Sequence, residues 1–341
     1  ARQRADVESL DDMSAIVLDI RELPESAAQD VRTLDIPQKL AKADLFDGYE
    51  LVRSFNTNNR VWLAQKNGQR VVLKFAPLEA VDSEPHLEAF IQETWNATRL
   101  RSQHFVRAFE PPGQTSRYYV MEFVDAPVLS SVLNKRLLSV DSAIGLGKFL
   151  ADAAQTLLRH ELVHGDIKPE NILCVGEYTH LTFKLLDLGS AAPVFCVTSR
   201  AGTASYLAPE RFHGAPISER TEIFSIGVTL YEALTGKLPF GVVERYQTPA
   251  FHAPKKLASL NPNLPPWLEA LIHRCLAIDP AHRYQHYSEL AFDLEHPDLV
   301  EPYHDAAAPW IERDPLTFYK RGFYLLLIVS AALFILLLTQ S

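Results

Sequence analysis

Four side chains that could move a phosphoryl group lie close together in the middle of the chain. Asp166, Lys168 and Asn171 stand within six residues, and Asp187 follows sixteen residues after the asparagine. A phosphoryl group in transfer is strongly anionic, so a protein assists by supplying fixed cations, divalent metal and positioning. An aspartate can accept a hydroxyl proton, a lysine can meet the phosphate, and amide and carboxylate oxygens suit Mg²⁺. The spacing therefore predicts metal-dependent phosphoryl transfer.

The wider pattern resembles the eukaryotic-type (Hanks-type) serine/threonine protein kinase family. The matching motifs are HGDIKPENIL at 164–173, DLG at 187–189 and APE at 208–210, in the family's order and spacing. The likeness covers roughly residues 48–295. It implies an ATP-dependent protein kinase in which Asp166, Lys168 and Asn171 are catalytic. It also implies that Asn171 and Asp187 hold Mg²⁺, with Mn²⁺ as the alternative metal.

The same resemblance places the nucleotide site in the first part of the chain. Lys74 ends the strand-like run RVVLK at 70–74, and the resemblance implies that it grips the α- and β-phosphates of ATP. Its ion-pair partner is expected to be Glu93, with Glu88 as the alternative. The further positions implied for the phosphate loop, and for the hinge whose backbone pairs with adenine, are Ser54, Asn56, Asn59, Val61, Met121, Glu122 and Val124.

The phosphate loop departs from the family because it lacks glycine. Ser54, Asn56 and Asn59 stand where the family has GxGxxG. Glycine is favoured there because the backbone must approach the phosphates and can need a positive φ. Asparagine is the next most tolerant residue at positive φ. We therefore expect the loop to form, with weaker nucleotide affinity.

A second departure concerns the activation segment. Gly165 stands where the family usually has an arginine that receives a phosphate from this segment. Its absence predicts that activity is not gated by that pairing, although Thr198, Ser199 and Thr203 remain candidate phosphorylation sites. Thr203 is also expected to contact the catalytic loop through its hydroxyl. The run KPEN at 168–171 is typical of serine/threonine kinases rather than tyrosine kinases.

Two further acidic residues are expected to support the site. Glu222 stands where the family usually has an aspartate that caps the catalytic loop, and the longer side chain still permits capping. Glu210 and Arg283 are expected to form a structural salt bridge rather than a catalytic one.

The order of predicted elements indicates an α+β protein with a β-rich first part and a helical second part. Alternating apolar runs at 60–65 and 70–76 flank a Lys-Asn-Gly-Gln turn at 66–69, which is a strong hairpin signal. A helix is expected over 86–101, and helical periodicity dominates beyond residue 127. The resemblance implies the two-lobed protein kinase fold, with a small β-rich lobe over a large, mainly helical lobe.

The chain divides into six expected segments. These are the terminal strand of an upstream phosphatase-like domain at 1–22, a linker at 23–47, the small lobe at 48–126, the large lobe at 127–297, a juxtamembrane linker at 298–317 and a transmembrane helix at 318–340. The run DDMSAIVLDI at 11–20 resembles the last strand of 2C-type metal-dependent serine/threonine phosphatases, with Asp11 as metal ligand. That implies a phosphatase–kinase fusion, without phosphatase activity in this chain. The alternative is an unrelated linker strand.

The C-terminal run GFYLLLIVSAALFILLL at 322–338 carries no charged side chain. A helix of ~17 residues spans ~25 Å, slightly short of a ~30 Å hydrocarbon core. Lys320 and Arg321 precede the run, while the three residues after it are uncharged. The positive-inside rule therefore predicts a single-pass anchor in the inner membrane with the kinase facing the cytoplasm. The alternative is a buried core helix.

The amino-acid composition restricts the classes of molecule that the chain is expected to bind. The net charge is −9, and no basic stripe with interleaved aromatic residues occurs, which argues against a nucleic-acid partner. The three cysteines, Cys174, Cys196 and Cys275, lack a CxxC spacing. We expect them to be small buried hydrophobic residues rather than disulfide or zinc ligands. The expected partners are protein substrates carrying serine or threonine and the lipid bilayer.

One rival interpretation remains open. The missing glycines are compatible with a catalytically weak pseudokinase that acts as a membrane-tethered, nucleotide-sensing scaffold. A scaffold needs none of the charged and metal-ligating positions, yet all of them are retained together in Lys74, Glu93, Asp166, Asn171 and Asp187. Their retention favours the enzyme.

Overall fold

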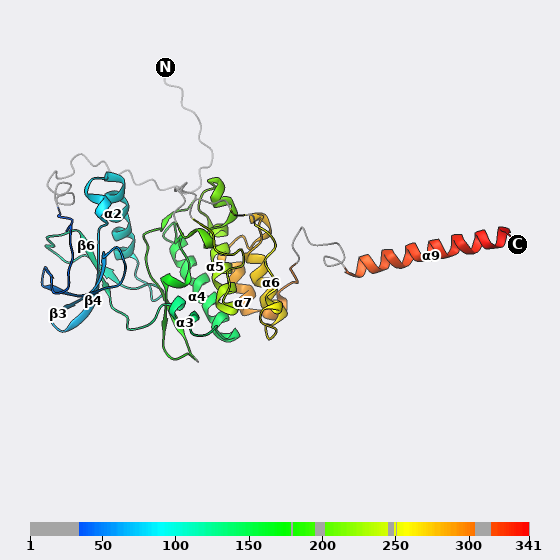
Figure 1. Ribbon diagram of the computed structural model, residues 1–341, viewed down its shortest axis with the longest axis horizontal. Helices are drawn as coiled ribbons and strands as arrows, with labels where there is room; N and C mark the ends of the chain where they lie inside the picture. The colour runs from blue at the N-terminus through cyan, green and yellow to red at the C-terminus, as the bar shows by residue number, and fades with distance from the viewer. Residues whose placement is uncertain are drawn as a thin grey trace, which may run out of the picture.

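The computed structural model describes residues 34–303 and 315–340, except for 179, 195–201, 245–248 and 250, and it describes the side chains of the last helix over 316–330. The strand expected within 1–22 and the candidate phosphorylation sites Thr198 and Ser199 lie outside the described residues. Figure 1 shows two lobes side by side, one built on a sheet and the other on helices. This confirms the two-lobed α+β prediction.

The small lobe is a six-stranded antiparallel sheet with one long helix against it. The strand order is β1-β2-β3-β4-β6-β5. The strands are β1 (Leu45–Phe46), β2 (Tyr49–Ser54), β3 (Val61–Lys66), β4 (Gln69–Phe75), β5 (Ala108–Phe109) and β6 (Tyr118–Glu122). The helix is α2 (Glu84–Arg99), which begins with Pro85 in its first turn, where a missing N–H costs nothing.

The β3–β4 hairpin forms for the reason that the sequence predicts. Asn67 and Gly68 both have positive φ, 51° and 78°. A two-residue turn with two positive φ values matches the right-handed twist of the flanking strands. The hairpin sets the register in which Val61 lies opposite Lys74, so the end of the phosphate loop is placed beside the lysine.

The described part of the expected linker at 23–47 is instead built into the small lobe. Leu45 and Phe46 pair with β2, and the backbone oxygen of Asp35 accepts a hydrogen bond from the Arg117 N–H at 2.7 Å. The buried Arg60 guanidinium donates to the backbone oxygen of Pro37 at 2.7 Å. Hydrogen bonds to backbone carbonyls do not depend on the type of side chain, so they cannot be recognised from the sequence. The polar composition of 23–47 alone therefore indicated a linker.

The large lobe packs its helices around a continuous apolar core. Its α-helices are α3 (Leu129–Leu133), α4 (Val140–Leu158), α5 (Glu219–Thr235), α6 (Pro266–Cys275) and α7 (Tyr287–Glu295). Its short strands are β7 (Leu162–Val163), β8 (Ile172–Val175), β9 (Thr182–Leu185) and β10 (Ala192–Pro193). The 3₁₀ turns of the whole chain are η1 (Leu78–Val81), η2 (Pro169–Asn171), η3 (Ala204–Tyr206), η4 (Pro209–His213), η5 (Leu257–Ser259), η6 (Pro280–His282) and η7 (Pro297–Leu299).

Helix α5 lies at the centre of this lobe and most of its side chains are buried. It begins with a reciprocal capping box between Ser218 and Thr221 and ends at Gly236, whose φ is 68°. Cys174 and Cys275 are buried free cysteines, and their burial confirms that these two are small residues of the core. Burial raises the pKa of the Cys174 thiol to about 11, so it stays protonated.

Arg283 ties the lobe together from a fully buried position. Its guanidinium makes two hydrogen bonds to the Glu210 carboxylate, at 2.7 and 2.9 Å. It also donates to the backbone oxygens of Ala277, Arg220 and Ile278. The expected structural salt bridge is therefore confirmed, and its donors are almost entirely satisfied by fixed acceptors.

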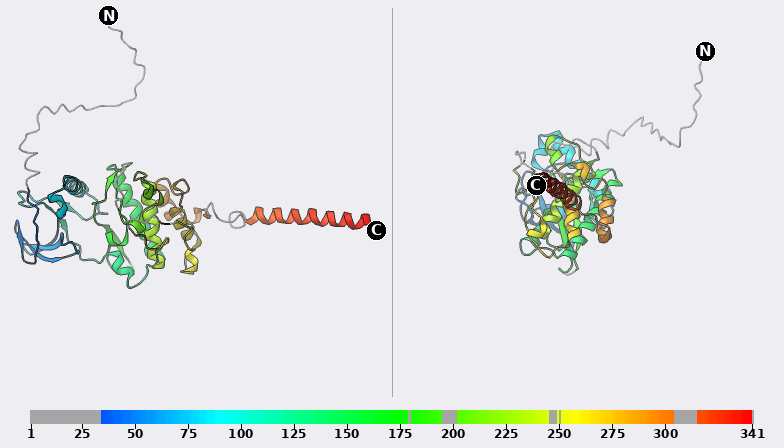
Figure 2. Two further views of the ribbon diagram at one scale, coloured as in Figure 1. Left: turned by 45° about the horizontal axis from the view of Figure 1, so that its top comes forward. Right: turned by 90° about the vertical axis from the view of Figure 1, so that its right-hand side faces the viewer.

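The last helix, α9 (Pro315–Gln340), extends away from both lobes (Figures 1 and 2). Large apolar side chains along its described part are exposed, among them Phe323, Leu326 and Ile328. None of the helices in the described part of the chain has both the length and the apolar content of a membrane crossing. The helical prediction for 318–340 is confirmed, but the predicted membrane crossing is not supported.

Replacing Arg283 with methionine should destabilise the large lobe strongly. The change leaves the Glu210 carboxylate and several carbonyls without their donor, and removing one partner of a buried pair costs about 3–5 kcal/mol. The matched control is Arg274→Met, because that guanidinium is 39 % exposed and lies 3.8 Å from Asp293. Chemical unfolding should show a loss of less than about 1 kcal/mol for the control. Equal, small losses in both variants would show that the buried pair does not hold the lobe.

Candidate active site

The small-lobe half of the site is an ion-pair cluster around Lys74. Its Nζ lies 2.5 Å from Glu93 Oε1 and 2.7 Å from Asp187 Oδ1. Lys74 comes from β4, Glu93 from α2 and Asp187 from the loop after β9, so one amine joins three elements. Glu88, the alternative partner, is exposed on α2. The prediction of Glu93 as the partner is confirmed.

A tyrosine that sequence reasoning missed completes this cluster. The Tyr119 hydroxyl donates to Glu93 Oε1 at 2.6 Å, and the tyrosine is buried in β6. Burial alone would lower the pKa of Lys74, but Tyr119, Asp187 and Glu93 raise it well above its ordinary value. Lys74 is therefore a permanently charged cation in a fixed position, as phosphate binding requires.

Asp187 is held ionised beside the lysine. Burial opposes its charge, but Lys74 and the backbone N–H of Gly189 lower the pKa of the carboxyl to about 2. Its backbone φ is 58°, an unusual conformation that turns the side chain back toward Lys74. The two hydrogen bonds that the Asp187 carboxylate accepts from described residues, from Lys74 and from the Gly189 N–H, both go to Oδ1. An ionised carboxylate with this arrangement suits a divalent cation.

The large-lobe half of the site is the catalytic loop. Lys168 Nζ lies 2.7 Å from Asp166 Oδ2. The Asn171 amide nitrogen donates to the backbone oxygen of Asp166 at 2.8 Å and to its Oδ2 at 3.0 Å. These contacts use the NH₂ group of Asn171, so its amide oxygen is the atom left to act as a ligand.

Thr203 joins the activation segment to this loop. Its backbone N–H and its hydroxyl donate to Asp166 Oδ1, at 2.8 and 2.9 Å. Lys168 Nζ donates to the same hydroxyl at 2.5 Å. The contact expected from sequence is confirmed. A hydroxyl within 3 Å of Asp166 also shows that this carboxylate can receive a hydrogen bond from an alcohol at the distance that a general base needs.

Two glycines allow this close approach. Gly165 has a φ of 79°, and a Cβ there would lie 2.7 Å from the backbone oxygen of Ser190. Gly202 has a φ of 104°, and a Cβ there would lie 2.6 Å from the backbone oxygen of Gly165. Real Cβ atoms do not come this close to backbone, so neither position accepts a side chain without movement. In this backbone, position 165 therefore fits glycine, and an arginine could not stand there without movement of the neighbouring chain.

Buried groups hold the catalytic loop from behind. Glu222 Oε1 accepts a hydrogen bond from the Gly165 N–H at 3.0 Å, and its Oε2 accepts one from the Tyr287 hydroxyl at 2.7 Å. The capping role expected for Glu222 is confirmed. His164 is fully buried, with Nε2 3.1 Å from the Leu186 backbone oxygen and Nδ1 accepting from the Asp166 N–H. Burial raises the pKa of Glu222 despite these partners.

The phosphate loop forms without glycine. Asn59 takes a φ of 59°, and its amide donates to the backbone oxygen of Leu40 at 2.7 Å. Asn56 Oδ1 accepts from the N–H groups of Arg60 and Val61, at 3.1 and 3.3 Å. The Ser54 hydroxyl donates to the Asn56 backbone oxygen at 2.9 Å. Asparagine thus supplies the positive φ, as expected.

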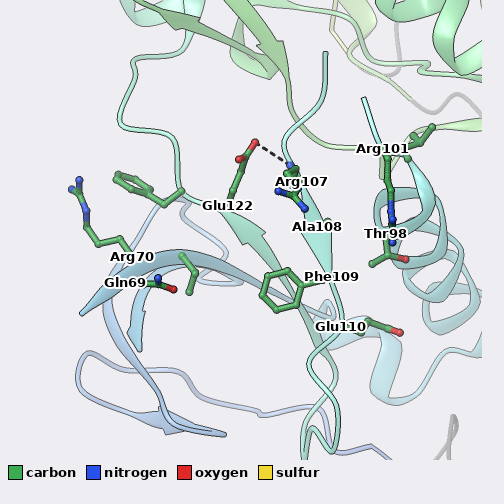
Figure 3. A pocket seen from close by; sticks show the side chains of 12 residues that line it. Gln69, Arg70, Thr98, Arg101, Arg107, Ala108, Phe109, Glu110 and Glu122 are labelled. Carbon is green, nitrogen blue, oxygen red and sulfur yellow. Dashed lines mark hydrogen bonds between the residues drawn. The ribbon is translucent and has the colours of Figure 1, made fainter. Parts of the chain in front are cut away.

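The hinge begins where β6 ends. Met121 lies next to last in β6, and Val124 follows two residues after the strand. The Glu122 backbone N–H donates to the Arg107 oxygen at 2.8 Å, and its carboxylate accepts from the Arg107 N–H, as Figure 3 shows. Lys184 Nζ, which sequence reasoning also missed, lies 2.6 Å from that carboxylate. Partial burial opposes ionisation, but Lys184 and Arg107 lower the pKa of Glu122.

Asn171 and Asp187 are the residues that could hold a divalent metal. Within the described ranges, no group of three or more His, Cys, Asp or Glu could hold an ion by itself. Mg²⁺ prefers one or two protein oxygens together with substrate phosphates and water rather than a complete protein cage. An amide oxygen and an ionised carboxylate fit that requirement.

Comparison with known proteins agrees with this geometry. A model of the protein kinase domain matches residues 59–293, and the chain belongs to this family. A Mycobacterium tuberculosis protein named serine/threonine-protein kinase PknA is 32 % identical over 250 residues, covering 70 % of this chain and 58 % of that protein. A probable serine/threonine-protein kinase of Clostridium perfringens is 29 % identical over 241 residues, covering 68 % of this chain and 35 % of that protein.

A third relative is the Bacillus subtilis serine/threonine-protein kinase PrkC, which is 25 % identical over 234 residues, covering 67 % of this chain and 36 % of the relative. The matches thus span between about a third and three fifths of the length of these curated relatives. The match to the protein kinase model, at 59–293, includes Lys74, Glu93, Asp166, Asn171 and Asp187.

Proposed function

We propose that this chain transfers the γ-phosphate of ATP to serine and threonine hydroxyls of proteins, including its own. The observation that carries the proposal is the joint placement of a fixed cation and a hydroxyl-binding carboxylate. Lys74 is held by Glu93 and Asp187, while Asp166 already accepts a hydrogen bond from the Thr203 hydroxyl at 2.9 Å. Relatives named serine/threonine-protein kinases support the choice of acceptor.

Each side chain has one physical task in this mechanism. Asp166 orients the acceptor hydroxyl and takes its proton, and Lys168, 2.7 Å from Asp166, offsets the charge that develops on the transferred group. Lys74 positions the α- and β-phosphates. Asn171 and Asp187 would hold Mg²⁺, which would supply charge neutralisation for the phosphates. The rest of the machinery keeps these groups in place.

The pseudokinase alternative is not favoured. A nucleotide-sensing scaffold has no use for Asp166, yet Asp166 receives hydrogen bonds or ion pairs from Asn171, Lys168 and Thr203. Groups that position a carboxylate so fully are expected where it does chemistry. Residues 11–20 keep their resemblance to a phosphatase strand, and a fused phosphatase remains a prediction.

We also propose that the C-terminal helix anchors the kinase to the inner membrane, with both lobes on the cytoplasmic side. Support comes from the uncharged run at 322–338 and from Lys320 and Arg321 before it. In the described part of α9, Phe323 and Leu326 are exposed. Large apolar side chains grouped in this way are unfavourable in water, and insertion into lipid would cover them.

Two aspartate variants separate chemistry from nucleotide binding. Asp166→Asn should lower phosphate transfer to a serine- and threonine-rich protein by about 10²–10⁴-fold while leaving ATP affinity near that of the parent, because only the base is lost. Asp187→Asn should weaken Mg²⁺-dependent ATP binding itself. Glu88→Gln, an exposed carboxylate on α2, is the control and should behave as the parent does. Transfer by Asp166→Asn at the parent rate would refute the proposed function.

Deleting residues 318–341 tests the anchor. In fractionated cells the full chain should pellet with membranes and resist high-salt extraction, because burial of apolar side chains rather than charge holds it there. The shortened chain should be soluble and still bind ATP. A full chain that stays in the soluble fraction as a monodisperse species would rule the anchor out.

A further inference from the structure

Residues 34–44, which precede β1, are fixed to the small lobe at several points, and we call this segment the strap. At its first end the Asp35 backbone oxygen accepts a hydrogen bond from the Arg117 N–H at 2.7 Å. In its middle the Leu40 side chain is 6 % exposed and belongs to the apolar core of the small lobe. Near its last end the Ala43 N–H donates to a backbone oxygen of β2 at 2.8 Å. The strap is therefore an ordered part of the lobe.

Two consecutive side chains at the end of the phosphate loop bind the strap. The Asn59 amide donates to the Leu40 backbone oxygen at 2.7 Å. The buried Arg60 guanidinium donates to the backbone oxygens of Pro37 and Ala76, both at 2.7 Å. Because Ala76 directly follows β4, these bonds join the strap, the phosphate loop and the end of the strand that carries the phosphate-binding lysine.

The bond from Asn59 is one that a glycine cannot make. The family pattern has glycine at this position, and glycine adopts a positive φ without steric cost. Asn59 takes the same kind of conformation, with a φ of 59°, and adds a side-chain amide donor. The described hydrogen bonds of the Ser54 and Asn56 side chains, in contrast, stay within residues 54–61. Asn59 therefore links the loop to a segment outside it.

We propose that Asn59 is a positioning residue for ATP, through which the strap sets the place of the phosphate loop and the affinity for the nucleotide. The inference rests on the proposed function, because it assigns regulation to that same nucleotide site. A loop with a fixed end loses less conformational freedom when it closes on phosphates, so it binds them more tightly. Displacement of the strap therefore weakens ATP binding, and by reciprocity bound ATP stabilises the strap.

Asn59→Gly restores the residue of the family pattern and removes the amide. The affinity of the full chain for a non-hydrolysable ATP analogue with Mg²⁺ should fall about three- to tenfold, as expected for one lost hydrogen bond. The kcat at saturating ATP should stay within about twofold, because Asp166 and Lys168 are unchanged. If backbone preference alone mattered, glycine would bind the analogue at least as well as asparagine. The direction of the change therefore separates the two explanations.

Asn67→Gly is the matched control. Asn67 also has a positive φ, 51°, and it lies exposed in the turn between β3 and β4. The substitution is chemically the same and removes an asparagine that lies outside the phosphate loop. This variant should bind the analogue as the parent does.

Hydrogen exchange of the unsubstituted full chain tests the coupling without any variant. Saturation with the analogue and Mg²⁺ should slow exchange of the strap amides by the same factor of about three to ten, since coupling between two sites is reciprocal. The strap contains none of the residues assigned above to nucleotide binding, so direct contact does not account for such slowing. In Asn59→Gly the slowing should be lost.

The outcomes distinguish this inference from the proposed function. A parent chain that binds no nucleotide would overturn both. Where the parent binds the analogue, the inference alone is overturned by any of three results: Asn59→Gly binds as tightly as the parent, Asn67→Gly loses as much affinity as Asn59→Gly, or the strap amides exchange alike with and without nucleotide.

Discussion

The catalytic centre depends on a backbone contact between two glycines. At Gly202 the activation segment approaches the catalytic loop so closely that a Cβ would lie 2.6 Å from the Gly165 oxygen. This approach brings Thr203 onto Asp166 and Lys168. The backbone N–H and the hydroxyl of Thr203 both donate to Asp166 Oδ1. A shift of either the activation segment or the catalytic loop would therefore break two hydrogen bonds at once.

The contact replaces a charged interaction with a steric one. Where an arginine and a phosphate fix an activation segment, the segment can be released by removing the phosphate. Here Glu222 fixes the Gly165 N–H from the large-lobe core, and Gly165 and Gly202 fit together through shape. Shape does not change with phosphorylation, so this part of the site is expected to be assembled in the unmodified chain.

In the small-lobe half of the site, the buried positive charge of Lys74 is compensated by the carboxylates around it. Lys74 links β4, α2 and the loop after β9 through Glu93 and Asp187. Tyr119 adds a hydrogen bond to the glutamate, so neither carboxylate lacks a donor. A displacement of α2 would leave a buried cation and a buried anion with fewer partners, which couples the position of this helix to nucleotide binding.

The sequence was most informative where a few consecutive residues determine the chemistry or the backbone conformation. The residues around Asp166 and Asn171, and the turn at Asn67-Gly68, could be read directly because side-chain type or φ is demanded locally. Lys74 and Glu93 could be paired only through the family pattern. Tyr119 and Lys184 were missed because their partners lie far away in sequence. The bond from Arg60 to Pro37 was missed because its acceptor is backbone. The steric reason for Gly165 needed the neighbouring Ser190 oxygen.

The most direct measurement is the initial rate of phosphate transfer by protein whose intact mass shows no phosphate. The unmodified chain should transfer phosphate without a lag, while unmodified Gly202→Ala should be at least about tenfold slower, because a displaced Asp166 loses much of the contribution of a general base. Gly214→Ala is the control, since Gly214 also has a positive φ of 79° but nothing within 4 Å of its Cβ position. An unmodified chain that is inactive until it acquires phosphate, or a Gly202→Ala variant as fast as the control, would contradict the account.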